Sequence, residues 1–149
     1  MDDSLLSRQL RALLAGQTDW LANTANFAAF IFEQMPQLNW VGFYRLRGDE
    51  LLLGPFQGRP ACTCLKRGKG VCWAAAEKGS PLVVPDVHAF PGHIACDSAS
   101  QSEMVLPLII SGKLWGVLDI DSPVKNRFGA DEQDFLQRAV EMLLAHTSF

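Results

Sequence analysis

The sequence has no long apolar run and no excess of positive charge. No segment approaches the ~20 consecutive apolar residues that a membrane-spanning helix requires. The 13 lysines and arginines are outnumbered by 16 aspartates and glutamates, which gives a net charge of −3. Binding to nucleic-acid phosphates requires a concentrated positive surface. We therefore expect no membrane and no nucleic acid among the partners of this protein.

The N-terminus also lacks the features of a secretory signal. It reads MDDSLLSRQL, which is acidic and amphipathic, without a positive start followed by an apolar stretch. We therefore expect a cytoplasmic protein in a reducing compartment. Permanent disulfides are rare there, and cysteines more often bind metal or take part in catalysis.

What the chain does contain is typical of one globular domain spanning residues 1–149. Its length matches the common size of a single domain, and 48% hydrophobic with 19% charged residues is enough to form a substantial core. Internal repeats and low-complexity tracts are missing. The composition thus predicts one compact domain.

Hydrophobic periodicity and turn residues predict an α+β fold. We expect helices at 2–15, 19–35, 70–78 and 130–145, and strands at 39–46, 51–56, 82–84, 103–110 and 113–121. Two strand pairs are joined by short turns and should form hairpins, which breaks the regular alternation of a parallel doubly wound sheet. The expected architecture is a central, mostly antiparallel sheet flanked by helices. Residues 86–101 read as a long loop with room for a helical turn, and such loops are often functional.

Three acidic residues fall on expected strands. Side chains two apart on a strand share a face, so Asp119 and Asp121 should project together, in one row with Val117 and Trp115. Glu103 opens the strand that pairs with theirs. One alternative places the acids on a solvated side of the sheet. Against it, Asp119 follows the apolar run LWGVL, and a site that binds an ammonium group and keeps one acid protonated would explain the cluster.

The first expected strand offers an aromatic wall for the same side of the sheet. Trp40, Gly42 and Tyr44 share a face by the same count. If that face is the one that carries the acids, the sheet presents aromatic rings beside carboxyl groups.

Three of the four cysteines lie among glycines and turn residues rather than in apolar runs. Cys62, Cys72 and Cys96 occur in PACTC, GKGVC and GHIACDSAS, whereas a structural cysteine usually packs as a small hydrophobe. Cys72 falls in the first turn of an expected helix, where it could pack or where the helix dipole could stabilise a thiolate. Cys64 carries the weakest signal, and we expect a structural role for it.

A metal site is the competing interpretation of the same thiols. It would use Cys62, Cys64 and Cys96 together with His88 and His93. The spacings do not match paired C-x-x-C zinc motifs. We therefore expect no metal ligands and interpret the two histidines as residues that order the loop.

Several segments together resemble a known enzyme family. PFQGRPAC, GKGVC, VPDVHAFPGHIACDSASQSE and GVLDIDSP are similar to the signature segments of free methionine-(R)-sulfoxide reductases, which are single GAF domains. NWVGFY and RFGADEQDFL extend the resemblance over most of the chain. One position departs from the family pattern: Trp73 stands where a glycine is expected, next to Cys72.

The resemblance implies residue roles. Cys96 is expected to be the nucleophile, with Cys62 and Cys72 as the thiols that regenerate it and Cys72 as the rival for the attacking role. The acidic substrate site would be Glu103, Asp119 and Asp121, with Glu103 and Asp121 also catalytic. The aromatic wall that binds substrate would be Trp40 and Tyr44.

The implied activity is thiol-dependent reduction of free L-methionine (R)-sulfoxide to L-methionine. A sulfenic acid on Cys96 would condense with Cys62 to an intramolecular disulfide, which a thioredoxin-type reductant would reopen, with no cofactor. The alternative is a non-catalytic GAF domain that senses a small molecule, because a fold does not fix a function. Small GAF domains commonly pair, so the N-terminal helix is a candidate homodimer interface.

Overall fold

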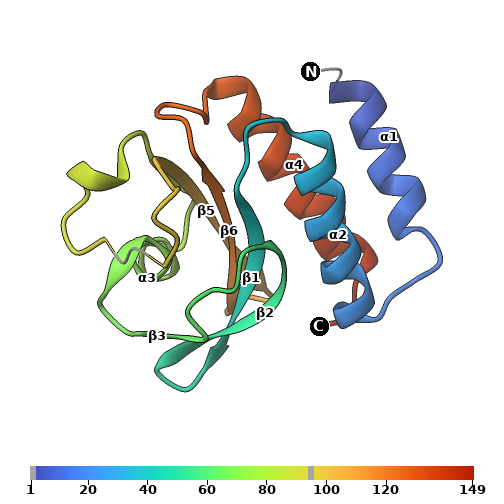
Figure 1. Cartoon of the computed structure of the whole chain (residues 1–149). Coiled ribbons are helices and arrows are strands. Elements are labelled where there is room, and N and C mark those ends of the chain that lie inside the picture. The colour runs from blue at the N-terminus through green and yellow to red at the C-terminus, as the bar shows by residue number, and fades with distance from the viewer. Residues whose placement is uncertain (1–2, 94–95) are drawn as a thin grey trace.

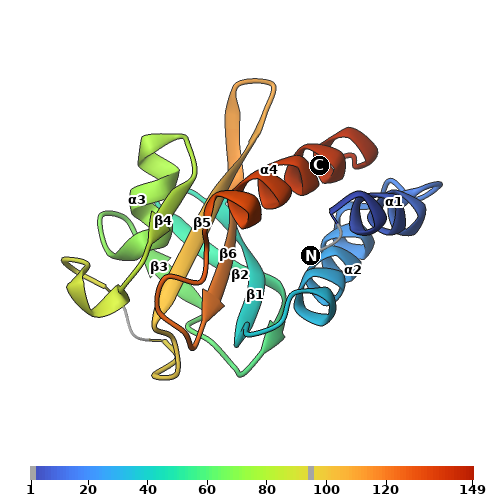
Figure 2. The same cartoon turned by 90° about the horizontal axis from the view of Figure 1, so that it is seen from above.

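The computed structural model describes residues 3–93 and 96–149, so the expected helix start at residue 2 and residues 94–95 of the long loop lie outside the described residues. Within these ranges, six strands form one sheet in the order β3-β2-β1-β6-β5-β4, and every neighbouring pair is antiparallel. Helices α2 and α4 cover one face of the sheet, α1 packs on the outside of these two helices, and α3 lies on the other face of the sheet with the connecting loops (Figures 1 and 2). The predicted α+β architecture with an antiparallel sheet is confirmed.

The order of helices and strands along the chain agrees closely with the predicted order. The helices are α1 (Asp3–Leu14), α2 (Trp20–Gln34), α3 (Gly70–Lys78) and α4 (Ala130–His146), with a short 3₁₀ helix η1 (Val87–Ala89). The strands are β1 (Trp40–Arg47), β2 (Glu50–Gly58), β3 (Cys64–Lys66), β4 (Leu82–Val84), β5 (Ser102–Ile110) and β6 (Lys113–Ser122).

The helical layer forms the larger part of the core. Helix α2 begins as predicted at an Asp19 cap, whose side chain accepts a hydrogen bond from the Ala22 backbone at 2.9 Å. Its apolar stripe packs on the sheet, with Phe27 against Phe43 of β1 at 5.8 Å between ring centroids. This layer fixes one face of the sheet and leaves the other face to line a pocket.

Strand β6 contains a β-bulge, and this bulge contradicts the predicted orientation of Trp115. Gly116 pairs with Leu108 and Leu114 with Ile109, so Trp115 has no partner on β5. The extra residue turns Trp115 to the helical face, where its ring lies 5.5 Å from that of Trp20. The prediction that Trp115 shares a face with Asp119 and Asp121 is therefore wrong, although Val117 does share it.

Strand β3 was not predicted. It is only three residues long, and it pairs with Glu50, Leu51 and Leu52 at the edge of the sheet. Trp73 of α3 holds this edge, because its indole Nε1 donates a hydrogen bond of 2.7 Å to the Leu65 carbonyl. The indole that replaces an expected glycine thus joins α3 to β3.

Among residues 3–93 and 96–149, the helices are all too short or too polar to cross a bilayer.

Candidate active site

A disulfide joins the two loops that the resemblance singled out. Cys62 lies between β2 and β3, Cys96 lies just before β5, and the two are 34 residues apart in the chain. Their Cα atoms are 5.7 Å apart, within the range that a bridge requires. The structure is therefore that of the oxidised form, and the Cys62–Cys96 pairing that the resemblance implied is present.

Two aromatic residues of β1 hold the loop that carries Cys62. Tyr44 donates a hydrogen bond from its hydroxyl to the Cys62 carbonyl at 2.9 Å, and the Trp40 indole donates to the Arg59 carbonyl at 3.1 Å. The two rings stack with their centroids 5.8 Å apart. Gly42 lies between them in sequence, and any side chain there would meet the Trp40 ring and Phe56. The predicted aromatic wall thus exists, and it positions a cysteine.

The loop that carries Cys96 is tied to the start of β1. Asn39 donates hydrogen bonds of 3.0 Å from its side-chain amide to both the Asp97 carboxylate and the Ser100 hydroxyl. The Gln101 backbone donates to the Ser122 carbonyl at 2.7 Å. Both cysteine loops are therefore anchored to the central strands.

The sheet brings the three predicted acids together on the pocket face. Glu103 of β5 is paired with Asp121 of β6. Asp119 precedes Asp121 by two residues on β6, so its side chain lies on the same face of the sheet. Their exposed fractions are only 6%, 8% and 7%, respectively. The alternative of a solvated acidic face is therefore excluded. On the other side of β6, Trp40 pairs with Asp121, so the aromatic wall adjoins the acids directly.

Burial changes the acid strength of this cluster. Desolvation raises the pKa of Glu103 and of Asp121 well above the ordinary value, and the charge of Asp119 adds to both rises. Burial also raises the pKa of Asp119, but hydrogen bonding with Glu103 and Asp121 opposes this rise. Asp119 is thus the acid that best keeps its charge, flanked by two acids that favour their neutral form.

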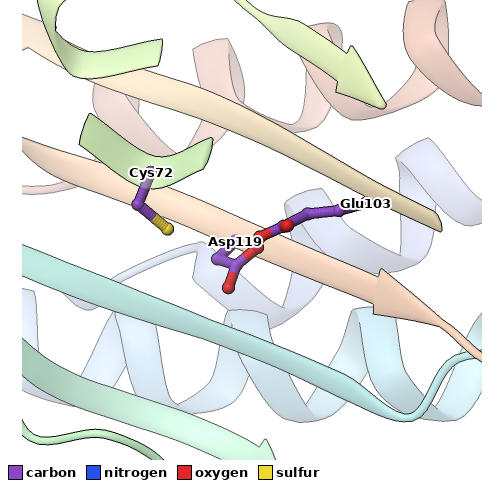
Figure 3. A group of neighbouring side chains, drawn as sticks. All are labelled: Cys72, Glu103 and Asp119. Atoms are coloured by element: carbon purple, nitrogen blue, oxygen red, sulfur yellow. The ribbon is translucent and has the colours of Figure 1, made fainter. Parts of the chain in front are cut away.

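Cys72 is the free thiol of the site. It lies buried in the first turn of α3, and Figure 3 shows its sulfur directed at the carboxylate of Asp119, beside Glu103. Burial raises the pKa of this thiol well above its ordinary value, and the nearby charge of Asp119 raises it further. The helix dipole that could have stabilised a thiolate is thus outweighed, and Cys72 is held as a neutral thiol.

His93 is a residue of the site that the sequence-based reasoning missed. Its Nε2 lies 3.8 Å from a carboxylate oxygen of Glu103, with the imidazole largely enclosed. Desolvation lowers its pKa, with the charge of His88 as a second cause. The sequence did contain one indication of this role, because His93 directly precedes the IACD segment that carries Cys96. The interpretation of His93 as only a loop-ordering residue is incomplete, whereas His88 lies in η1, outside the pocket lining.

Most of these groups line one pocket, whose empty space is about 570 Å³ when the part open to solvent is counted. Arg59 and Lys69 also line it and bring positive charge to a site of buried acids. The predicted residues that it collects are Trp40, Tyr44, Cys72, Cys96, Glu103, Asp119 and Asp121. Cys62 reaches it through the disulfide.

The cysteines and histidines that the competing metal-site interpretation would use do not come together as ligands in this disulfide form. Cys62 and Cys96 are bonded to each other, and Cys64 lies on the edge strand β3. A different group could hold a cation: Cys72, Glu103 and Asp119 each offer a ligand atom, and these atoms lie within 4.8 Å of one another.

A curled antiparallel sheet with a pocket on the face that α3 covers defines the class of the protein. It is a GAF domain, and the GAF domain family matches residues 19–145.

Similar proteins and solved structures show to which family of GAF domains the chain belongs. The free methionine-R-sulfoxide reductase of Escherichia coli is 46% identical over 147 residues, which covers 97% of this chain and 89% of that protein. Protein YtsP of Bacillus subtilis is 50% identical over 144 residues, covering 95% and 88%. The structure of the Neisseria meningitidis free methionine-R-sulfoxide reductase in complex with its substrate superposes with a TM-score of 0.91 at 42% identity, covering 98% and 90%. The chain belongs to the free methionine-R-sulfoxide reductase family.

Proposed function

We propose that this protein reduces free L-methionine (R)-sulfoxide to L-methionine with its own thiols. The observation that carries the proposal is that the Cys62–Cys96 disulfide reaches the same pocket as three buried acids and the Trp40 ring. The reductase names of the E. coli relative and of the Neisseria meningitidis substrate complex support the same chemistry.

The pocket has complementary groups for a free amino acid. The Trp40 face can enclose the methyl group of the substrate, and the carboxylate of Asp119 can bind its α-ammonium group. A methionine sulfoxide within a peptide has no such ammonium group. The buried acid would then be left without its partner, at a cost of several kcal/mol, which favours the free amino acid strongly.

The first chemical step is attack by the Cys96 thiolate on the sulfoxide sulfur. The sulfoxide oxygen takes a proton and passes to the cysteine sulfur, so that methionine leaves and Cys96 becomes a sulfenic acid. Glu103 and Asp121 are suited to donate the proton, because burial and the charge of Asp119 raise their pKa and so favour their neutral form. General-acid help of this kind typically contributes ~10²–10⁴-fold.

The second step regenerates the thiol. The Cys62 thiol attacks the Cys96 sulfenic acid, a sulfur–sulfur bond forms, and water leaves. The product of this step is the disulfide present in the structure. A dithiol reductant of the thioredoxin type then reduces the bridge by thiol–disulfide exchange and is itself oxidised.

Cys72 is the alternative attacking thiol and the third redox thiol of the family pattern. Its raised pKa weakens it as a nucleophile, because only a thiolate attacks efficiently. Its contact with Asp119 suits a residue that tunes the acid cluster. Cys96 is therefore assigned the attack and Cys62 the regeneration, whereas Cys72 is assigned a place in the acid cluster.

A second candidate function is a non-catalytic GAF sensor. It predicts ligand affinity that does not depend on any thiol. The disulfide whose Cys96 lines the pocket disfavours it, because a sensor would not require a redox pair there.

The decisive experiment offers the reduced protein both sulfoxide epimers of free and of peptide-bound methionine, with a thioredoxin system as reductant. We expect consumption of the free R epimer and at least a hundredfold slower consumption of the other three substrates. Cys96→Ser should abolish turnover with the fold intact by circular dichroism. Unchanged consumption by Cys96→Ser would overturn the nucleophile assignment, and no consumption of the free R epimer by the native protein would overturn the function.

A further inference from the structure

We propose that Cys72, Glu103 and Asp119 form a binding site for a thiophilic divalent cation, with zinc as the best match. The chemistry assigned above uses no metal, so the cation would be a ligand of the resting protein rather than a cofactor. The three residues come from α3, β5 and β6, and Figure 3 shows their functional groups converging on one point.

The geometry is close to that of a zinc site. The three ligand atoms lie within 4.8 Å of one another. Zinc bonds of ~2.3 Å to sulfur and ~2.0–2.2 Å to oxygen place tetrahedral ligands ~3.3–3.7 Å apart. Small rotations of the side chains would therefore bring all three atoms into the first coordination shell. The mixture of one sulfur with two oxygens favours zinc over magnesium or calcium, which take oxygen ligands.

An independent observation points to a missing ligand. Apart from the titratable groups of its own cluster, the Oδ1 atom of Asp119 has no hydrogen-bond partner among the described residues, and the residue is 93% buried and lines the pocket. Buried polar atoms are nearly always paired in native proteins, and an unpaired one is costly. A cation coordinated by this oxygen would pair it.

His93 lies beside this group, next to Glu103. His93 Nε2 lies 3.8 Å from Glu103 Oε1, close to the spacing of two ligands on one zinc ion. Binding releases the proton of the Cys72 thiol and that of the Glu103 carboxyl, so two protons leave as one divalent cation enters.

The site overlaps the position assigned to the substrate. If the proposed function holds, the metal occupies Asp119, which binds the α-ammonium group, so zinc and free methionine should exclude each other. Metal binding itself does not rest on the proposed function, and it can be measured without turnover.

The test uses the disulfide form of the full chain, because Cys62 and Cys96 are then unable to bind metal. The free cysteines of the described chain are Cys64 and Cys72. Cobalt(II) is the probe, because a cobalt–thiolate bond gives a charge-transfer absorption band that carboxylate sites lack. We expect one cobalt per chain with this band, and displacement by stoichiometric zinc. Absence of the band, or cobalt binding without it, would overturn the proposal.

Two variants and a matched control locate the site. Cys72→Ser should remove the band, whereas Cys64→Ser should leave the band and the Kd unchanged. Asp119→Asn should keep the band and raise the Kd at least tenfold, and it serves as the second variant if Cys72→Ser does not fold. A band that persists in Cys72→Ser, or that is lost in Cys64→Ser, would place the metal elsewhere. Free L-methionine should raise the apparent Kd for cobalt, and a Kd that stays constant would contradict the shared position.

Discussion

The hydroxyl of Tyr44 donates a hydrogen bond of 2.9 Å to the backbone carbonyl of Cys62. The loop that carries Cys62 also accepts the indole hydrogen bond of Trp40 through the Arg59 carbonyl. The same two rings that form the wall of the pocket therefore hold one half of the disulfide. A substrate seated against this wall would lie next to the thiol that closes the redox cycle.

Tyr44→Phe tests whether this hydrogen bond serves regeneration. The ring remains, but the Cys62 carbonyl loses its donor, so we expect slower disulfide formation and about 1 kcal/mol less stability. Release of the first methionine should be unaffected. Rapid-quench measurement of methionine alongside the loss of free thiols separates the two steps. Equal slowing of both steps would show that the tyrosine acts on substrate binding instead.

Single replacements of the regenerating thiols distinguish their roles. Cys62→Ser should release about one methionine per chain in a single turnover and then stall, because Cys96 sulfenic acid has lost the partner that lies beside it. A sulfenic-acid trapping reagent should label Cys96 in that variant. Cys72→Ser is the matched control, and it should sustain turnover. Stalling of Cys72→Ser with continued turnover of Cys62→Ser would reverse the assignment.

Much of the fold and of the acid cluster could be predicted from local patterns. The two-residue period placed Asp119 and Asp121 on one face, and the hairpin placed Glu103 on the neighbouring strand. The same two-residue period gave a wrong orientation for Trp115. A bulge there inserts one extra residue into β6, which turns the Trp115 side chain to the opposite face, and no feature of the sequence marks the bulge. Strand β3 was missed because three residues are too few for a period to appear.

The remaining parts of the site depend on contacts between distant segments. Spacing alone did not pair Cys62 with Cys96; that pairing came from the resemblance to the family. His93 was assigned to loop ordering because nothing local places its ring 3.8 Å from Glu103. The expected homodimer, the cytoplasmic location and the thioredoxin reductant remain predictions.

Gly42→Ala tests the placement of the aromatic wall. An added Cβ would meet the Trp40 ring and the Cβ of Phe56, and the latter can move only with its backbone. We expect a loss of about 1–3 kcal/mol in stability, as for other overpacked sites. The KM for free methionine sulfoxide should rise about tenfold, since the displaced indole would no longer enclose the methyl group. Trp40→Phe is the comparison, because it keeps a flat ring without the clash. An unchanged KM in Gly42→Ala would argue against a role of the wall in binding.

Asp121→Asn tests the acid cluster through both stability and rate. The folded-state pKa of Asp121 is raised by burial and by the charge of Asp119. A raised pKa means that the folded state binds the proton more tightly, so this contribution to stability is present at low pH and is lost as the pH rises through the folded-state pKa. An asparagine cannot ionise. Above that pKa the variant should therefore be more stable than the native protein, by on the order of 1 kcal/mol for each unit by which the pKa is raised.

Denaturant unfolding of the native protein and of Asp121→Asn from pH 4 to pH 8 measures the difference in their free energies of unfolding. This difference should approach zero at the acidic end of the range. Turnover should fall ~10²-fold or more if Asp121 donates the proton to the sulfoxide oxygen. Glu141→Gln, on the exposed face of α4, is the matched control and should change neither quantity. A variant that is less stable than the native protein at pH 8 would mean that Asp121 is ionised and favourably paired there. In that case the proton would have to come from Glu103, and Glu103→Gln should then show the larger loss of turnover.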